Sequence, residues 1–260
     1  MQLTVVKIGG NIIDDKDKLS AFLLAFSQLE GARILVHGGG RIATDMGLKL
    51  GIESNYVNGR RITDKETLSL VTMVYGGLIN KTIVAELQSV GCNAIGLTGA
   101  DGNILPALKR PVRDVDYGFV GDVTSNGVNT TVLSTLLQSG LTPVLAPLTH
   151  DGHGSMLNTN ADTIAREVAR ALAAIFEVQL IYCFEKKGVL SDPTDDDSVI
   201  RRITAADFKE LTEKQIVSGG MIPKLENALA AVSDGVNKVI IGHADDLLAI
   251  RSGEAGTCIL

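Results

Sequence analysis

Short runs of β-branched and aliphatic residues alternate with longer stretches of helical periodicity along nearly the whole chain. The predicted strands are Leu3–Ile8, Arg33–His37, Ala94–Leu97, Pro143–Pro147, Gln179–Cys183 and Lys238–Ile241. The predicted helices cover roughly Lys16–Glu30, Ile42–Leu50, Asp64–Val90, Thr130–Gln138, Ala161–Ile175, Ala205–Glu213, Pro223–Gly235 and Ala244–Arg251. Because this alternation is typical of parallel strands joined by helices, we expect an α/β fold, a three-layer αβα open and mainly parallel sheet.

Local signals refine this pattern. Thr63 and Glu66 have the spacing of a capping box, and Asn160 is placed to cap the helix that follows it. Between Asp101 and Val123, short apolar runs separated by Gly, Pro and Asp predict hairpins over one end of the sheet. A fresh strand–loop–helix series begins after Ile175, so we expect two lobes, residues 1–175 and 176–260.

Composition excludes several classes of protein. Apolar residues make up 45% of the 260 positions and aromatic residues only 4%, so the core must be aliphatic. The net charge of −6 argues against nucleic acid or an anionic membrane as a partner. No apolar run approaches the roughly 18 residues of a membrane span, and three scattered cysteines suit a reducing compartment, so a soluble cytoplasmic protein is expected.

Two glycine turns follow the first two predicted strands. The strand Leu3–Ile8 ends in Gly9-Gly10, and the strand Arg33–His37 ends in Gly38-Gly39-Gly40. In an open α/β sheet, ligands bind beyond the carboxyl ends of strands, where helix N-termini offer free N–H groups to anions. The pair therefore predicts two anionic groups, or one phosphoryl group held from two sides, although for either turn alone a tight strand-to-helix turn is the better explanation. His37 is expected only to make a hydrogen bond at the strand end.

Two lysines occupy positions that local physics disfavours. Lys7 interrupts a buried apolar strand and needs an anionic partner, while Lys224 falls in the first turn of a helix, against the helix dipole. Asp162 begins another helix, where its carboxylate is stabilised and could hold lysine ammonium groups, or could simply complement the dipole. The acidic triplet Asp195–Asp197 is interpreted as a solvated loop tip, so no metal site built from protein side chains is expected.

Taken together, these segments resemble the amino-acid kinase family, which also includes the carbamate kinases. The matching pieces run in family order: Lys7-Ile8-Gly9-Gly10, Val36-His37-Gly38-Gly39-Gly40, Asn58-Gly59-Arg60-Arg61-Ile62-Thr63, Asn80-Lys81, Gly118-Phe119-Val120-Gly121, Asn158-Thr159-Asn160-Ala161-Asp162, Gly220-Met221-Ile222-Pro223-Lys224 and Gly256-Thr257. The Asn-Gly-x-Arg and Asn-x-Asn-x-Asp segments are more specific to the branch that phosphorylates N-acetylglutamate.

The resemblance implies an ATP- and Mg²⁺-dependent kinase acting on the γ-carboxylate of an N-acylated glutamate in arginine biosynthesis. By position it assigns catalysis to Lys7, Lys224 and Asp162, phosphate binding to Gly9 and Gly10, and substrate binding to Gly39, Gly40, Arg61, Asn158 and Asn160. Nucleotide contacts are implied for Glu185, Lys186, Gly188, Val189, Leu190, Gly220 and Met221. The N-terminal lobe would bind the amino acid and dimerise, and the C-terminal lobe would bind ATP.

One departure and three alternatives stand beside this reading. Such kinases usually carry a Thr/Ser-Asp-Val-x-Gly run after the strand Gln179–Cys183, whereas here the chain reads Phe184-Glu185-Lys186-Lys187-Gly188. The chain lacks the extra N-terminal helix of arginine-inhibited hexamers, so a homodimer is expected. N-succinylglutamate as acceptor, another amino-acid kinase activity, and a catalytically silent sensor on the same fold remain open.

Overall fold

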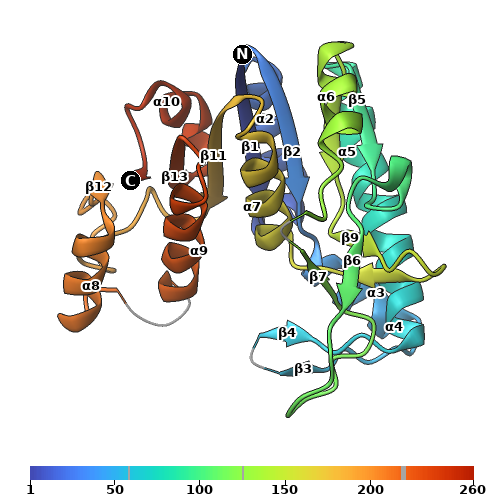
Figure 1. Ribbon diagram of the computed structural model, residues 1–260. Coiled ribbons are helices and arrows are strands. Elements are labelled where there is room, and N and C mark those ends of the chain that lie inside the picture. The colour runs from blue at the N-terminus through green and yellow to red at the C-terminus, as the bar shows by residue number, and fades with distance from the viewer. Residues whose placement is uncertain (58, 125, 218–220) are drawn as a thin grey trace.

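The computed structural model describes residues 1–57, 59–124, 126–217 and 221–260. Its main sheet has eight strands in the order β12-β14-β13-β11-β1-β2-β8-β5 (Figure 1). These are β1 Gln2–Ile8, β2 Ala32–His37, β5 Ala94–Leu97, β8 Thr142–Leu145, β11 Glu177–Phe184, β12 Arg202–Ile203, β13 Lys238–His243 and β14 Thr257–Ile259. Every neighbouring pair is parallel except β13 with β14, which confirms the predicted mainly parallel sheet.

Helices cover both faces of this sheet. They are α1 Gly10–Ile13, α2 Lys16–Ser27, α3 Gly40–Lys49, α4 Lys65–Val71, the π-helix η1 Thr72–Ile79, α5 Asn80–Ser89, α6 Thr130–Gln138, α7 Ala161–Leu172, α8 Ala205–Glu213, α9 Met221–Ser233 and α10 Leu247–Ser252, with short 3-10 turns η2 Asp101–Asn103 and η3 Ala244–Asp246. One apolar core packs α6, α7 and α9 against the sheet, and the other packs α2, α4, η1, α5 and α10.

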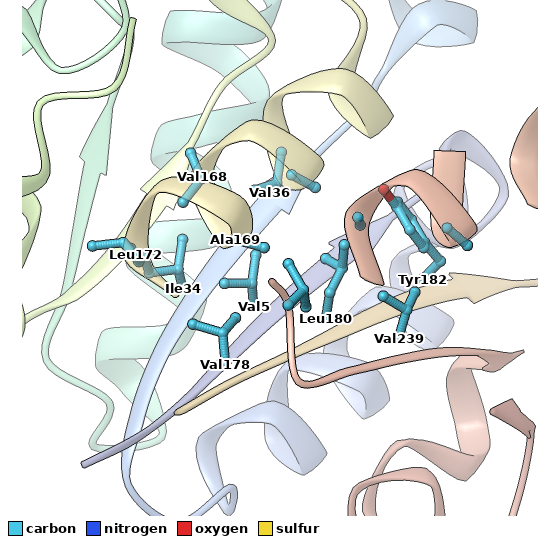
Figure 2. Packing of buried hydrophobic residues seen from close by; sticks show 14 of the residues in the cluster. Val5, Ile34, Val36, Val168, Ala169, Leu172, Val178, Leu180, Tyr182 and Val239 are labelled. Carbon is cyan, nitrogen blue, oxygen red and sulfur yellow. The ribbon is translucent and has the colours of Figure 1, made fainter. Parts of the chain in front are cut away.

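The alternation of side chains along β1 explains both cores. Leu3 and Val5 point to the core shared with α7, whereas Val6 and Ile8 point to the opposite core. Figure 2 shows Val5 in the first core, close to the helix that carries Val168. Lys7 has the same parity as Val5, so the pleat directs its side chain toward α7.

The long predicted helix Asp64–Val90 forms as one continuous helix, but with two differences. The capping-box prediction for Thr63 and Glu66 is wrong, because Asp64 is the N-cap and accepts from the Thr67 N–H at 2.7 Å. Its middle third, η1, is a π-helix, a form that is frequent at functional sites. This π-helix brings Tyr75 and Ile79 against the second glycine turn.

The expectation that no segment approaches membrane-span length also needs correction. The continuous helix Lys65–Ser89 has 25 residues and is apolar enough, by length and composition alone, to cross a membrane. Its apolar side includes Leu70, Val74 and Ile83, which are buried in the second core, so packing against the sheet explains part of its hydrophobicity.

Three hairpins gather beyond the carboxyl ends of β1 and β2 (Figure 1). The pair β6 Ala107–Lys109 and β7 Gly121–Val123 confirms the predicted hairpin region. The pairs β3 Tyr56–Val57 with β4 Arg60–Arg61, and β9 Leu148–His150 with β10 Met156–Asn158, were not predicted. Isolated bridges join Thr63 to Gly118 and Val120 to Asn158, so the hairpins brace one another around one end of the sheet.

Candidate active site

Lys7 lies near the carboxyl end of the central strand and is paired with Asp162. Its Nζ is 2.7 Å from Asp162 Oδ1, and only 9% of the lysine side chain is exposed. Asp162 is the second residue of α7, whose cap is the side chain of Asn160. The contact therefore joins the carboxyl end of β1 to the N-terminus of α7. The helix N-terminus stabilises the Asp162 carboxylate as an anion.

Lys224 reaches the same place from the first turn of α9. Its Nζ lies 3.8 Å from the centre of the Phe184 ring, and Lys7 Nζ lies 5.5 Å from the same centre. Burial lowers the pKa of Lys224, with the charge of Lys7 acting in the same direction and Asp162 and Glu185 acting against it. Two ammonium groups thus lie close to one aromatic ring. An anion bound there would stabilise the charged form of both lysines.

The two glycine turns lie side by side at the same edge. Gly38 N–H donates to the Ile8 carbonyl at 3.1 Å, and a Cβ on Gly38 would stand 3.9 Å from Gly10 N. Gly10 and Gly40 each begin a helix, so their N–H groups have no acceptor within those helices. The turns therefore present a concave row of N–H donors suited to an anion.

Gly39 is required for conformational and steric reasons. Its φ of 137° is one that residues with a Cβ rarely adopt, and a Cβ there would lie 2.2 Å from Ile79 Cδ1. The second turn can therefore pack directly on η1 only with glycine at this position.

A first pocket of about 280 Å³ is lined by both glycine turns, Arg61, Asn158, Asn160 and the Lys7–Asp162 pair. Arg61, on β4, is only 7% exposed. Its guanidinium donates to the Gly40 carbonyl at 2.7 Å, contacts Ser54 Oγ, and lies 4.8 Å from the centre of the Tyr56 ring. These contacts hold a permanent cation in the pocket wall.

The two asparagines of this pocket differ in their partners. Asn158, at the end of β10, donates from Nδ2 to Thr63 Oγ1 at 3.0 Å. Asn160 has an extended backbone, and its Oδ1 accepts from the Thr163 N–H at 3.0 Å, so it caps α7 as predicted. Both residues line the pocket.

A second pocket of about 360 Å³ lies on the other side of Lys7. Glu185, Lys186, Gly188, Met221 and Lys224 line it. Of the other residues expected to contact a nucleotide, Val189 and Leu190 are buried and do not line this pocket, and Gly220 lies outside the described residues, as does Asn58 of the first pocket's motif.

The two pockets have a common wall made of Lys7, Gly9, Gly10 and Asp162. A ligand in either pocket therefore reaches the same ammonium group and the same glycine turn. Cys183 also lines the second pocket, but burial raises the pKa of its thiol to about 12, so the thiol remains protonated and is no nucleophile. This arrangement suits a transfer between two anionic ligands.

Several residues of the site were not singled out from the sequence. They are Phe184 under the two ammonium groups, Arg110, Val120 and Pro147 in the first pocket, and Tyr75 from η1. Phe184 ends β11, the strand next to β1, so adjacency of the two strand ends was the signal that could have found it. Arg110, Val120 and Pro147 lie next to hairpin strands and Tyr75 lies on η1, so their places in the site depend on tertiary contacts.

The chain is similar to known proteins of one family. The sequence model of the "Amino acid kinase family" matches residues 2–243. An "Acetylglutamate kinase" of Phocaeicola vulgatus is 60% identical over 258 residues, covering 99% of this chain and 98% of that protein. The crystal structure of smu.665 from Streptococcus mutans UA159 is 31% identical, with a TM-score of 0.76, over 99% of this chain and 98% of that one.

A carbamate kinase from Giardia lamblia, solved bound to AMP-PNP, has a TM-score of 0.71 at 14% identity. The match covers 100% of this chain and 98% of that one, and at that identity it shows the shared fold alone. The expected fold class and the resemblance are both confirmed. The chain belongs to the amino acid kinase family, and within it to the group of the acetylglutamate kinases.

Proposed function

We propose that this protein transfers the γ-phosphoryl group of ATP to the γ-carboxylate of N-acetyl-L-glutamate, forming N-acetylglutamyl 5-phosphate in arginine biosynthesis. Relatives 56–60% identical over nearly the full chain are named acetylglutamate kinases. The observation that carries the proposal is the wall shared by the two pockets, with an arginine-lined side for the acceptor and a lysine-lined side for ATP.

The acceptor needs no general base. A γ-carboxylate has a pKa of about 4.3 in its unperturbed state, so it is already an anion at neutral pH. Its oxygen forms a bond to the γ-phosphorus while the bond from that phosphorus to the β,γ-bridging oxygen breaks, and the electron pair leaves with ADP. The task of the protein is therefore to bring two anions together and to stabilise the charge on the equatorial oxygens.

The residues of the common wall supply that stabilisation, together with Lys224 of the second pocket and the second glycine turn of the first. Lys7 and Lys224 offset the charge of the transferring group, and Asp162 holds Lys7 at 2.7 Å in its position. The N–H groups of Gly9 and Gly10 face the phosphoryl group, and those of Gly39 and Gly40 face the reacting carboxylate. Arg61, Asn158 and Asn160 hold the α-carboxylate at the far end of the pocket, which fixes the angle of attack.

Mg²⁺ is proposed to enter with ATP. Among the described residues, no three His, Cys, Asp or Glu side chains gather into a metal-binding cluster. The carboxylates lining the second pocket are Asp162, already paired with Lys7, and Glu185. This donor set fits an ion held mainly by phosphate oxygens and water, with Glu185 near it. When bound, the ion would draw charge from the phosphate oxygens.

We assign residues 1–175 to acceptor binding and dimerisation, and residues 176–260 to ATP binding. The residues lining the first pocket all precede Ala174, whereas Phe184, Glu185 and Lys224 line the second. Met73 and Leu78, on η1, are 57% and 50% exposed, which supports a homodimer formed across this helix. Three free cysteines suit the cytoplasm, where this protein would act.

A panel of acceptors tests the function. Purified protein with Mg²⁺ and ATP would be offered N-acetylglutamate, N-succinylglutamate, free glutamate, aspartate, carbamate and UMP, with ADP release and hydroxylamine trapping of acyl phosphate as readouts. N-acetylglutamate is expected to give the highest kcat/KM. A preference for N-succinylglutamate would show that the acyl group of the acceptor is succinyl. Turnover only on one of the last four compounds would refute an N-acylated glutamate as acceptor. No turnover with retained ligand binding would indicate a sensor.

A further inference from the structure

Two fully buried polar side chains lie directly behind the second glycine turn and take no part in the mechanism above. His37 ends β2 and Asn80 begins α5, and both are 0% exposed. Asn80 Nδ2 lies 3.1 Å from His37 Nε2. A buried polar pair next to a ligand-binding turn must be explained, because each unpaired polar group would cost free energy.

The surroundings of Asn80 fix the orientation of its amide. The nitrogen Nδ2 lies 3.0 Å from the Val144 carbonyl, which can only accept. The oxygen Oδ1 lies 3.1 Å from Lys81 Nζ, which can only donate and which also donates to the Gly96 carbonyl at 2.7 Å. The amide nitrogen therefore faces His37 as a donor, and Nε2 of the imidazole must be the acceptor.

This arrangement determines the tautomer of His37. With Nε2 unprotonated, the neutral ring carries its hydrogen on Nδ1, which lies 2.8 Å from the Gly38 carbonyl. Burial lowers the pKa of His37 to about 4, so the ring is neutral at physiological pH. The Gly38 carbonyl is thereby held on the buried side of the turn.

The peptide plane transmits this constraint to the pocket. A trans peptide is planar, with its C=O and N–H in opposite directions, and no peptide bond among the described residues is cis. Holding the Gly38 carbonyl toward the imidazole turns the Gly39 N–H away from it. Gly39 lines the first pocket, and within the described part of the chain its N–H has no backbone acceptor.

We propose that His37 is a positioning residue for phosphoryl transfer: Asn80 sets its tautomer, and its Nδ1–H fixes the Gly38–Gly39 peptide so that the Gly39 N–H points at the reacting carboxylate. The kinetic consequence of this inference rests on the proposed function. The tautomer of His37 and the orientation of the Gly38–Gly39 peptide do not depend on that function. A histidine that only fills space would need neither a defined tautomer nor a donor toward Gly38.

The tautomer can be measured without any substrate. In a long-range ¹H–¹⁵N spectrum of protein labelled at its four histidines, with His37 assigned by loss of its signals in His37→Gln, the ring is expected as the Nδ1–H form at pH 7. An Nε2–H ring would overturn the proposal. Asn80→Asp places an acceptor opposite Nε2 and is expected to move the hydrogen to Nε2, whereas an unchanged Nδ1–H ring would contradict control by Asn80.

Two substitutions at one position separate positioning from packing. In His37→Asn the amide nitrogen takes the place of Nδ1 and can still donate to the Gly38 carbonyl. In His37→Gln the amide takes the place of Nε2 and meets Asn80 instead. We expect His37→Asn to keep kcat within about fivefold and His37→Gln to lose about 10- to 100-fold in kcat, with a smaller change in the KM for ATP.

The melting temperature of both variants is measured alongside, because both remove the ring. Equal losses of kcat that follow the losses of stability would show a structural role only and overturn the proposal. If the wild-type protein phosphorylates none of the acceptors, the proposed function fails, while the tautomer measurement still decides whether Asn80 and His37 orient the Gly38–Gly39 peptide.

Discussion

At the scale of single residues, the site depends on two ammonium groups brought to one aromatic ring. Lys7→Ala and Lys224→Ala are each expected to lower kcat by at least about 100-fold, because each removes a positive charge that stabilises the transition state. The KM for N-acetylglutamate should change much less, since Arg61 holds the α-carboxylate. Initial rates of ADP release at saturating ATP, over a range of N-acetylglutamate concentrations, measure both quantities.

The matched control is Lys209→Ala on α8, whose side chain is 81% exposed and forms only a distant pair with Glu213. It should leave kcat and the melting temperature unchanged. If either active-site variant kept wild-type turnover while remaining folded, the catalytic role of that lysine would be refuted.

Because the imidazole of His37 is buried, we expect the folded protein to lose stability in acid. Its pKa is lowered from 6.5 to about 4 in the folded protein, so the unfolded chain binds the additional proton between these values. The free energy of unfolding should therefore fall as the pH drops from 6.5 toward 4, with this residue contributing about 3 kcal/mol over the window, and its contribution is fully present above pH 6.5.

Urea unfolding at several pH values measures this slope. In His37→Asn, which cannot titrate in this range, the decrease between pH 6.5 and 4 should be smaller by about that amount. Parallel curves for the two proteins would show that His37 is not responsible.

Residues whose type conflicts with their local setting could be predicted from the sequence. Lys7 breaks an apolar strand and Lys224 opposes a helix dipole, and the structure brings the two to one ring. Arg61 could be selected only with the help of the family resemblance, since its partners at Gly40, Ser54 and Tyr56 come together through an unpredicted hairpin. The role of Phe184 was not predicted, because this residue lies in the segment where the sequence departs from the family pattern.

At the scale of elements, the contact between the π-helix η1 and the second glycine turn is decisive. Gly39→Ala would force a Cβ to within 2.2 Å of Ile79 Cδ1 at a φ of 137°. The turn must move away from η1, so stability should fall by more than the roughly 1 kcal/mol of backbone strain alone, and kcat by at least about tenfold. Thermal unfolding and initial rates measure the two effects.

Gly140→Ala is the matched control, because Gly140 also has a positive φ, +76°, but nothing lies within 4 Å of the added Cβ. It should show the backbone strain without loss of turnover. Equal behaviour of the two variants would mean that crowding against Ile79 is unimportant.

Elements with strong periodicity were predictable, and those that depend on tertiary contacts were not. The strand Ala94–Leu97 and the helices Thr130–Gln138 and Ala205–Glu213 agree with the sequence prediction at both ends. A π-helix cannot be told from an α-helix by apolar spacing of this kind, and Asp64 displaced Thr63 as cap because Thr63 forms a bridge with Gly118. The two-residue strands of β3 and β4 are too short to carry a pattern.

At the scale of the whole molecule, the exposed apolar residues of η1 predict a dimer. The wild-type protein should have a solution mass of about twice the 27.4 kDa chain. Because Met73 and Leu78 would be buried between subunits, Met73→Glu/Leu78→Glu should shift the mass to that of a monomer, as measured by sedimentation velocity or light scattering.

Leu248→Glu changes a residue that is 42% exposed on α10, away from this helix, and should leave the dimer intact. A wild-type monomer would refute the dimer. If the double variant stays dimeric, the dimer interface lies on another surface of the protein.

The central claim is that a carboxylate oxygen of the acceptor attacks the γ-phosphorus of ATP where the two pockets meet. N-acetylglutamate labelled with ¹⁸O in its γ-carboxylate, turned over with MgATP and followed by ³¹P NMR, tests this most directly. We expect an acyl phosphate resonance with the isotope shift of one ¹⁸O bonded to phosphorus. An acyl phosphate resonance without the isotope shift, or ADP formed with no acyl phosphate resonance, would contradict it.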